Sequence, residues 1–249
     1  MSIRSAPEEQ SEVPEEHERL LPNDPEHQPM GSEATALKPE GRKGDNTAKA
    51  AALVFVVSAW SIVLSNNPTS LGWFAFHPIL QSSAIACFTY GILTLQPTSQ
   101  PQTKAAGLQR HQIAMIGLGF PLILLGTLAM IYNKALHAAP HFTSWHGTLG
   151  IIAVVWLFGQ VLLGAGSVWF GGAAFGGGAK AKALWKYHRL SGYILFPLLF
   201  ITAHLAGAWS IWVVGHSVLL VRLVGFTIAP IVVLAGVYTR IRPSKMKFL

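Results

Sequence analysis

The sequence predicts an all-α membrane protein, in which a disordered N-terminal tail precedes a six-transmembrane-helix bundle. Only 12% of the 249 residues are charged and 51% are hydrophobic, whereas soluble domains usually carry about 25% charged residues. All 11 acidic residues lie between Glu8 and Asp45, so residues 46–249 contain none. Six long apolar segments occupy this acid-free part. We therefore divide the chain into a cytosolic tail, residues 1–46, and a membrane domain, residues 47–249.

The tail is rich in Pro, Glu, Ser and Gly and nearly lacks aromatic residues. Such a composition buries too little apolar surface to offset the entropy lost on folding, so we expect disorder. Within the tail, the spacing of Glu16 from Leu20 and Leu21 is similar to the acidic di-leucine sorting signal of endosomal and vacuolar membrane proteins. This pattern favours an endosomal or vacuolar membrane, with a chance match as the alternative.

Each apolar segment has about the length that a helix needs to cross the hydrocarbon core, roughly 20 residues. The expected spans are Ala48–Leu64, His77–Leu95, His111–Tyr132, His146–Phe170, His188–Trp209 and Gly215–Tyr238. Proline inside the third, fifth and sixth spans is compatible with this interpretation, because neighbouring helices and local irregular turns can satisfy the freed backbone groups. The segment Gly171–Lys180 lacks the ending of a phosphate-binding loop, and we expect a flexible cytosolic loop there.

Basic residues near the span ends fix the expected orientation, because Lys and Arg accumulate on the cytosolic side. One side has Lys134 alone. The side that carries both termini has 14 bases: Lys38, Arg42, Lys43, Lys49, Lys104, Arg110, Lys180, Lys182, Lys186, Arg189, Arg240, Arg242, Lys245 and Lys247. Both termini are therefore expected in the cytosol. Since these bases lie between apolar spans, we do not expect the protein to bind nucleic acid. The expected partner is the lipid bilayer.

The residue types that are missing exclude several classes of site. Cys87 is the one cysteine, so a disulfide framework and Cys-rich zinc or iron–sulfur sites are excluded. Residues 46–249 have no Asp or Glu, so catalysis by carboxylates cannot occur within the membrane domain.

Four histidines stand at the start of four successive predicted spans, namely His77, His111, His146 and His188. With the expected orientation, His77 and His146 lie near the non-cytosolic face, and His111 and His188 lie near the cytosolic face. Ionisable residues at membrane depth are costly and usually functional. Two imidazoles from two helices at each face form the ligand set of a haem, so the pattern predicts two noncovalent, b-type haems. Glycines one turn after two of these residues, Gly150 and Gly192, would leave room for a flat porphyrin.

Other interpretations of the histidines stay open. A single helix-end histidine is commonly an interfacial residue, and imidazole also suits zinc. His204 is a rival ligand, because 16 residues after His188 place it roughly 24 Å along the helix, near the depth of the non-cytosolic pair. We expect it to donate to a haem propionate or to cap a pocket, with an exchange of His77 for His204 as the alternative. His137, His141 and His216 lie in or beside non-cytosolic loops. They are either solvated side chains or a binding site for ferric ion or an ascorbyl radical.

The segments around the four histidines, FAFHPIL, QRHQIAM, SWHGTLG and KYHRLSGY, resemble the cytochrome b561 family, and in particular its stand-alone transmembrane reductase branch. The likeness covers nearly all of residues 48–240. It implies one haem on His77 and His146 and another on His111 and His188. It also implies electron transfer from cytosolic ascorbate to a non-cytosolic acceptor, either ferric ion or monodehydroascorbate. The sequence departs from the Ser-Leu-His-Ser-Trp motif of some members, with Thr143-Ser144-Trp145-His146-Gly147 instead.

Arg110, Lys182, Lys186 and Arg189 lie beside the cytosolic pair of histidines and could bind the ascorbate anion or haem propionates. Among them we favour Lys186 and Arg189, with topology alone as the alternative explanation of the cluster. A histidine-based metal transporter and a non-catalytic membrane scaffold are the competing functions. The sequence leaves open the acceptor, the organelle and a homodimeric state.

Overall fold

The computed structural model describes residues 44–95, 101–241 and 246, and these form helices and short connections without a β-strand. Residues 1–43, including the di-leucine pattern, lie outside the described residues. Asp45 and Asn46, which the sequence analysis assigns to the tail, are already helical. The boundary between tail and membrane domain therefore falls slightly earlier than predicted, because the first helix extends beyond its apolar segment.

Six helices among the described residues are long and apolar enough to cross a membrane, which confirms the predicted all-α fold with six spans. The first is α1 (Asp45–Leu64) and the second is α3 (Trp73–Leu95). The third joins α4 (Pro101–Gln112), the π-helical turn η2 (Ile113–Gly119) and α5 (Phe120–Leu136). The fourth joins α6 (Trp145–Val168) to the 3₁₀ segment η3 (Trp169–Phe175). The fifth is α7 (Gly178–Ala183) and α8 (Trp185–Trp209), and the sixth is α10 (Leu219–Leu223), η4 (Val224–Ile228) and α11 (Ala229–Tyr238).

Several boundaries differ from the predicted ones. The helix of the third span begins at Pro101, so His111 lies well inside it rather than at its start. The helix continues over a polar stretch that carries no apolar signal, which is why hydropathy placed its start too late. The sixth span begins at Leu219, because Gly215 still belongs to the short helix α9 (Ile211–His216), which ends before that span. The expected loop Gly171–Lys180 contains parts of η3 and α7 instead of a fully irregular segment.

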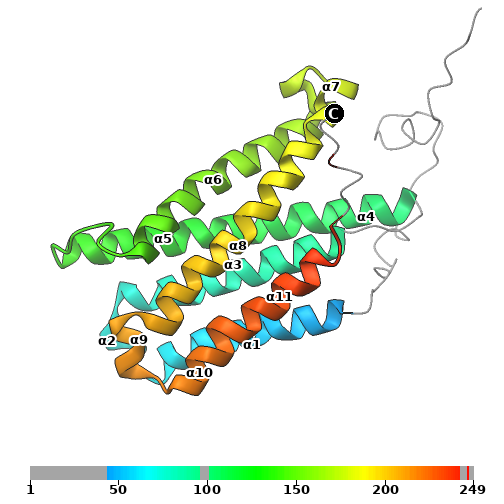
Figure 1. The fold of residues 1–249 in the computed structure, drawn as a ribbon. Coiled ribbons are helices and arrows are strands. Elements are labelled where there is room, and N and C mark those ends of the chain that lie inside the picture. Colours follow the sequence, from blue (N-terminus) through cyan, green and yellow to red (C-terminus); the bar gives the residue numbers. More distant parts are fainter. Residues whose placement is uncertain (1–43, 96–100, 242–245, 247–249) are drawn as a thin grey trace, which may run out of the picture.

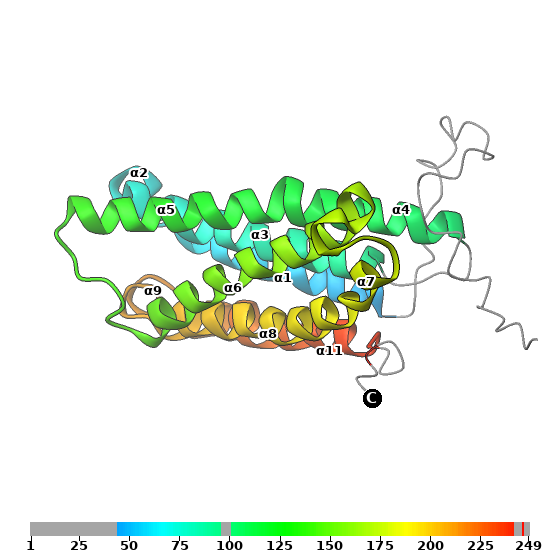
Figure 2. The same ribbon diagram turned by 90° about the horizontal axis from the view of Figure 1, so that it is seen from above.

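The spans form an elongated bundle whose connections alternate between its two ends (Figures 1 and 2). The short helix α2 (Pro68–Leu71), α9 and the α5–α6 connection lie at one end. The start of α4, α7 and the end of α11 lie at the other end. The main neighbours are α3 with α5, α6 with α8, and α1 with α3 and α11. The second and third spans thus form one antiparallel pair, and the fourth and fifth form another.

Aromatic packing joins the outer helices to this four-helix arrangement. Phe55 of α1 packs edge-to-face against Phe200 of α8 and Phe226 of η4, each at a centroid distance of 5.6 Å. Edge-to-face ring pairs add stability beyond that of the area they bury. Large apolar side chains also face outward along the spans, such as Leu162, which is 69% exposed. In a bilayer such residues meet lipid chains, so this surface matches a membrane-spanning bundle.

Two prolines explain where the helices become π-helical. Pro121 follows η2, and Pro230 follows η4, each as the second residue of the next α-helix. A proline inside a helix removes one backbone hydrogen bond and crowds the preceding turn. A wider π-turn immediately before the proline is one way to accommodate that change without ending the helix.

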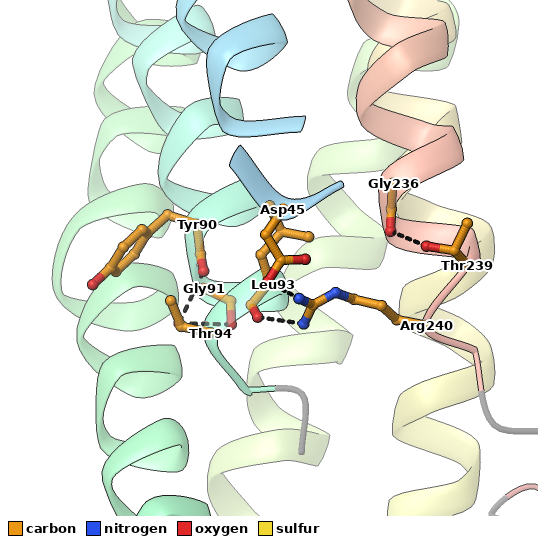
Figure 3. Close-up of polar contacts among 8 residues, drawn as sticks. All are labelled: Asp45, Tyr90, Gly91, Leu93, Thr94, Gly236, Thr239 and Arg240. Atoms are coloured by element: carbon orange, nitrogen blue, oxygen red, sulfur yellow. Dashed lines mark hydrogen bonds and ion pairs between the residues drawn. The ribbon is translucent and has the colours of Figure 1, made fainter. Parts of the chain in front are cut away.

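A buried ion pair lies where α1 begins and α11 ends (Figure 3). Asp45 and Arg240 are in contact through their charged groups, and each side chain is largely inaccessible to solvent. Arg240 Nη1 also donates a 2.7 Å hydrogen bond to the backbone oxygen of Leu93, near the end of α3. One guanidinium group therefore connects the first, second and sixth spans at one end of the bundle. Arg222, a buried residue of α10 in the sixth span, donates from Nη1 to the backbone oxygen of Ala208 at 2.9 Å.

Candidate functional site

The four predicted histidines meet as two pairs inside the bundle. His77 of α3 faces His146 of α6, with ring centroids 5.8 Å apart and planes at 81°. His111 of α4 faces His188 of α8, with centroids 6.4 Å apart and planes at 85°. In each pair, one histidine comes from the second or third span and the other comes from the fourth or fifth span. The two imidazoles of a pair are therefore close enough to act on one bound group.

Backbone carbonyls hold three of the four rings. His77 Nδ1 donates to the Gly126 oxygen of α5 at 3.0 Å, and His146 Nδ1 donates to the Thr202 oxygen of α8 at 2.8 Å. His111 Nδ1 donates to the Gly91 oxygen of α3 at 3.2 Å. Because a carbonyl only accepts, the proton sits on Nδ1 and the lone pair stays on Nε2. This is the arrangement by which proteins orient a metal-binding histidine.

The ring of His188 is placed by the facing residues of α6. Gln160 donates from Nε2 to the His188 backbone oxygen at 2.7 Å. His188 Nδ1 and Gln160 Oε1 are both buried without a hydrogen-bond partner among the described residues. A Cβ at Gly164 would lie 2.7 Å from His188 Cε1, so the ring occupies the space that a side chain there would fill. The fourth imidazole is therefore confined by shape more than by a hydrogen bond.

The two histidine pairs are separated along the bundle. His77 and Gly91, the residue whose carbonyl holds His111, are 14 positions apart on α3. His188 and Thr202, whose carbonyl holds His146, are also 14 positions apart on α8. At 1.5 Å per residue this spacing corresponds to roughly 21 Å. The pairs therefore form two layers near opposite ends of the spans.

The ring of His204 makes hydrogen bonds away from the two histidine pairs. Its Nδ1 donates to the Phe226 oxygen of η4 at 3.0 Å, and its Nε2 accepts a 3.0 Å hydrogen bond from Trp209 Nε1. Both ring nitrogens are thus engaged on the side of the sixth span. Thr202, two residues earlier on the same helix, faces His146 instead. A change of ligand from His77 to His204 would require the loss of both contacts.

The basic residues expected near the cytosolic pair fall into two groups. Lys186 and Arg189 lie in the first turns of α8, on either side of His188, and both are half-buried. Arg110 precedes His111 on α4 but lines a groove of about 380 Å³ that is open to the bundle surface. That groove is otherwise made mainly by apolar residues of α3 and η2 (Ala86, Cys87, Tyr90, Ile113, Ala114 and Leu118). Lys182 belongs to α7.

The loop histidines lie at the opposite end of the bundle and are exposed. His137 caps α5 by donating from Nδ1 to the Asn133 oxygen at 2.7 Å. His216 caps α9 in the same way, through the Trp212 oxygen at 2.7 Å. His141 contacts the Phe142 ring at a centroid distance of 5.8 Å. No group of three or more His, Cys, Asp or Glu side chains suited to one metal ion occurs in residues 44–95 and 101–241.

Sequence reasoning missed the residues that orient the histidines. Gly126, Gly91 and Thr202 act through their backbone oxygens, which no side-chain pattern reveals. Gln160 and Gly164 could have been found from register, because α6 and α8 run antiparallel. His146 faces Thr202, so the residue 14 positions after His146 lies opposite the residue 14 positions before Thr202. These two residues are Gln160 and His188.

The glycines expected to make room beside the rings behave differently from each other. A Cβ at Gly150 would make only an ordinary 3.6 Å contact with the Thr202 side chain. A Cβ at Gly192 would lie 2.9 Å from Gln160 Nε2, so this glycine accommodates the amide that binds the His188 backbone. Gly150 thus lies against Thr202 without a close contact, and Gly192 makes room for Gln160.

Comparison with known proteins identifies similar chains. The sequence profile of the family described as eukaryotic cytochrome b561 matches residues 75–213, more than half of the chain, and includes all four paired histidines. The transmembrane reductase CYB561D2 of Bos taurus is 29% identical over 160 residues. That alignment covers 60% of this chain and 66% of the relative, so the chain spans slightly less than two thirds of that protein's length.

Proposed function

The chain belongs to the eukaryotic cytochrome b561 family, and from that premise we propose that it carries electrons across a membrane through two b-type haems. The donor is cytosolic ascorbate, and the acceptor on the opposite side is ferric ion or monodehydroascorbate. The observation that carries the proposal is the pairing of four half-buried imidazoles in two layers roughly 21 Å apart.

The residues present fit a haem at each layer. His77 and His146 would hold one, and His111 and His188 the other, because each ring with a fixed tautomer offers its Nε2 lone pair. Residues 46–249 contain no Cys-x-x-Cys-His sequence, so attachment would be noncovalent. A bound haem supplies one-electron chemistry at its iron.

The protein's own contribution is orientation, spacing and exclusion of water. The carbonyls of Gly126, Gly91 and Thr202 keep a proton on Nδ1 of three rings, so each Nε2 stays available as a ligand. Rigid helices fix the distance between the layers. The absence of acidic residues after Asp45 leaves the interior without a carboxylate relay for protons. The chain is thus suited to moving electrons and does not offer a route for coupled proton transport.

Lys186 and Arg189 supply positive charge beside His188 at the end where the donor binds. Ascorbate is an anion at neutral pH, and an arginine can contact a carboxylate or enolate through two parallel hydrogen bonds. The same groups could bind haem propionates. Arg110 lies beside His111 but opens toward the surface groove, so we assign it the weaker role of attracting anions.

The proposed orientation rests on the charge distribution, and the proposed location rests on the di-leucine pattern of the tail. The bases at the end of the bundle that holds α7 and the end of α11 support a cytosolic position of both termini. The domain division of the sequence analysis then becomes an acidic cytosolic tail followed by the six-span membrane domain, in an endosomal or vacuolar membrane. A homodimer is compatible with this arrangement.

An absorption spectrum of the purified full-length protein tests the proposal. We expect two haems per chain with bands that ascorbate reduces, and electron transfer to an external ferric chelate when the protein is reconstituted in ascorbate-loaded vesicles. A protein that binds no haem when supplied with it would contradict the proposal and would favour a metal transporter or a scaffold.

A further inference from the structure

A chain of aromatic contacts leads from one histidine layer to the surface of the bundle. Phe74 lies three residues before His77 on α3, so the two side chains are neighbours on one helix face. The Phe74 ring contacts the Trp212 ring edge-to-face at a centroid distance of 4.8 Å. Trp212 in turn stacks on the ring of His216, with centroids 4.8 Å apart and planes at 16°. The contacts connect α3 to α9, which lies at the end of the bundle that also holds α2 (Figures 1 and 2).

The outer end of this chain is an exposed imidazole in a fixed orientation. His216 donates from Nδ1 to the Trp212 backbone oxygen at 2.7 Å, so its Nε2 carries the lone pair. Asn66 Nδ2 donates to the His216 backbone oxygen at 3.0 Å and ties α9 to the end of α1. Of the two ring nitrogens, Nε2 makes no hydrogen bond to the described residues. An exposed imidazole oriented in this way can bind a metal ion through Nε2.

We propose that His216 is the docking ligand for a metal-ion acceptor, and that the Trp212 and Phe74 rings connect it electronically to the His77 layer. The inference rests on the proposed function. Of the two candidate acceptors, ferric ion and monodehydroascorbate, it selects the metal ion, bound in a chelate that leaves one coordination position open to exchange. Because residues 46–249 contain no Asp or Glu, histidine is the strongest metal ligand that this surface offers besides the one cysteine, Cys87, on α3.

The electron balance is simple. A ferric ion docked at Nε2 of His216 gains one electron and becomes ferrous ion. A haem held by His77 and His146 would supply that electron and would itself be oxidised from the ferrous to the ferric state. The electron is replaced by oxidation of ascorbate through the cytosolic layer. No covalent bond forms or breaks, and the coordinate bond to Nε2 is released when the ferrous product leaves.

His137 provides a matched control within the same chain. It is also exposed at a helix end, and its Nδ1 donates to the backbone oxygen four residues earlier at 2.7 Å, as in His216. It differs in that the His137 ring contacts no aromatic ring among the described residues, whereas the His216 ring stacks on Trp212. If an exposed imidazole at this surface were sufficient, His137 and His216 would be equivalent. The stack on Trp212 predicts that they are not.

The kinetic experiment uses the full-length haem protein after reduction by ascorbate, mixed with ferric nitrilotriacetate or with monodehydroascorbate. His216→Ala should slow haem oxidation by the ferric chelate about tenfold or more, by loss of a metal ligand, and should leave oxidation by monodehydroascorbate unchanged. His137→Ala should leave both rates unchanged. Trp212→Leu should also slow oxidation by the chelate, and Trp212→Phe, which keeps a ring, should restore much of the rate. Unchanged chelate rates in His216→Ala and Trp212→Leu would overturn the inference.

A binding experiment gives a readout that does not depend on turnover. Gallium(III) nitrilotriacetate resembles the ferric chelate but is not reduced. It should protect His216 from carbethoxylation by diethylpyrocarbonate, measured by peptide mass spectrometry, and absence of protection would overturn the inference. Failure of the proposed function looks different, because the wild-type protein would then show no ascorbate-reducible haem. Ascorbate-reducible haems together with an unprotected His216 would leave the proposed function intact and refute the docking role alone.

Discussion

Asp45 and Arg240 form a buried ion pair that ties the first turn of the first span to the end of the sixth (Figure 3). Asp45 is the one acidic residue in the part of the chain that the structure describes. The pair is almost inaccessible to solvent, with exposed fractions of 6% for Asp45 and 3% for Arg240. Arg240 also binds the Leu93 carbonyl, so the pair joins three spans at the end where His111 and His188 lie.

Removing one charge of this pair should destabilise the bundle. Asp45→Asn leaves the Arg240 guanidinium buried without its counter-charge, which typically costs about 3–5 kcal/mol. The measurement is the free energy of unfolding in detergent, followed by helicity, with exposed Lys180→Gln as the control for a surface charge. The double variant Asp45→Leu with Arg240→Met should recover most of the loss, because two apolar side chains can replace a buried pair. A single variant as stable as the wild type would show that the pair contributes little.

Single histidine substitutions should remove haems by layer. His77→Ala and His146→Ala should each reduce the haem content from two to about one per chain and abolish the same spectral component, since a two-imidazole site loses one of its two axial ligands. His111→Ala and His188→Ala should remove the other component. Potentiometric titration followed by absorbance distinguishes the two haems. Loss of the same component from His77→Ala and His188→Ala would contradict the pairing.

His204→Ala should leave both haems in place. The ring of His204 already donates to Phe226 and accepts from Trp209, so it is a structural residue between the fifth and sixth spans. Its removal leaves a buried carbonyl with one acceptor site unpaired, which costs about 1–3 kcal/mol of stability. His204→Ala should therefore lower the thermal midpoint while the haem count stays at two per chain, whereas His77→Ala should lower the haem count. Loss of one haem from His204→Ala would restore His204 as a ligand.

A side chain at position 164 should weaken haem binding at the His111/His188 layer only. A side chain at this position meets His188 Cε1 at 2.7 Å, so Gly164→Val must displace the imidazole. Displaced ligand support typically weakens metal binding 10–100-fold, and we expect that range for the His111/His188 haem with the other haem unaffected. Gly159→Val on the same helix is the matched control, because a Cβ there meets nothing within 4 Å. Equal effects of the two variants would point to a general helix effect.

The sequence predicts the spans and the histidine pairs well because both depend on strong periodic signals. Apolar segments of membrane length mark the helices, and alternating orientation sorts His77 with His146 and His111 with His188. Helix ends were predicted less well, as at Pro101, because polar residues can continue a helix beyond the apolar core. The orienting carbonyls and the contacts of His204 could not be predicted, since they depend on how neighbouring helices pack. The ion pair of Asp45 was missed because this residue was counted with the tail.

Removing or reversing positive charge near His188 should weaken the binding of the donor more than it slows the oxidation of the bound donor. Lys186 and Arg189 flank His188 at the start of α8, so they bring positive charge to the end of the bundle where the proposed donor would bind. Arg189→Gln should raise the KM for ascorbate about tenfold or more, because a charge-assisted hydrogen bond contributes roughly 1.5–3 kcal/mol. Lys186→Glu should act in the same direction and should also reduce the dependence of KM on ionic strength, since long-range attraction is screened by salt. Stopped-flow reduction of the haems at several salt concentrations measures both effects.

Lys180→Gln, in the exposed first turn of α7, is the control for net charge. If its KM rose as much as that of Arg189→Gln, the positive face alone would explain donor attraction and a specific contact at Arg189 would be refuted.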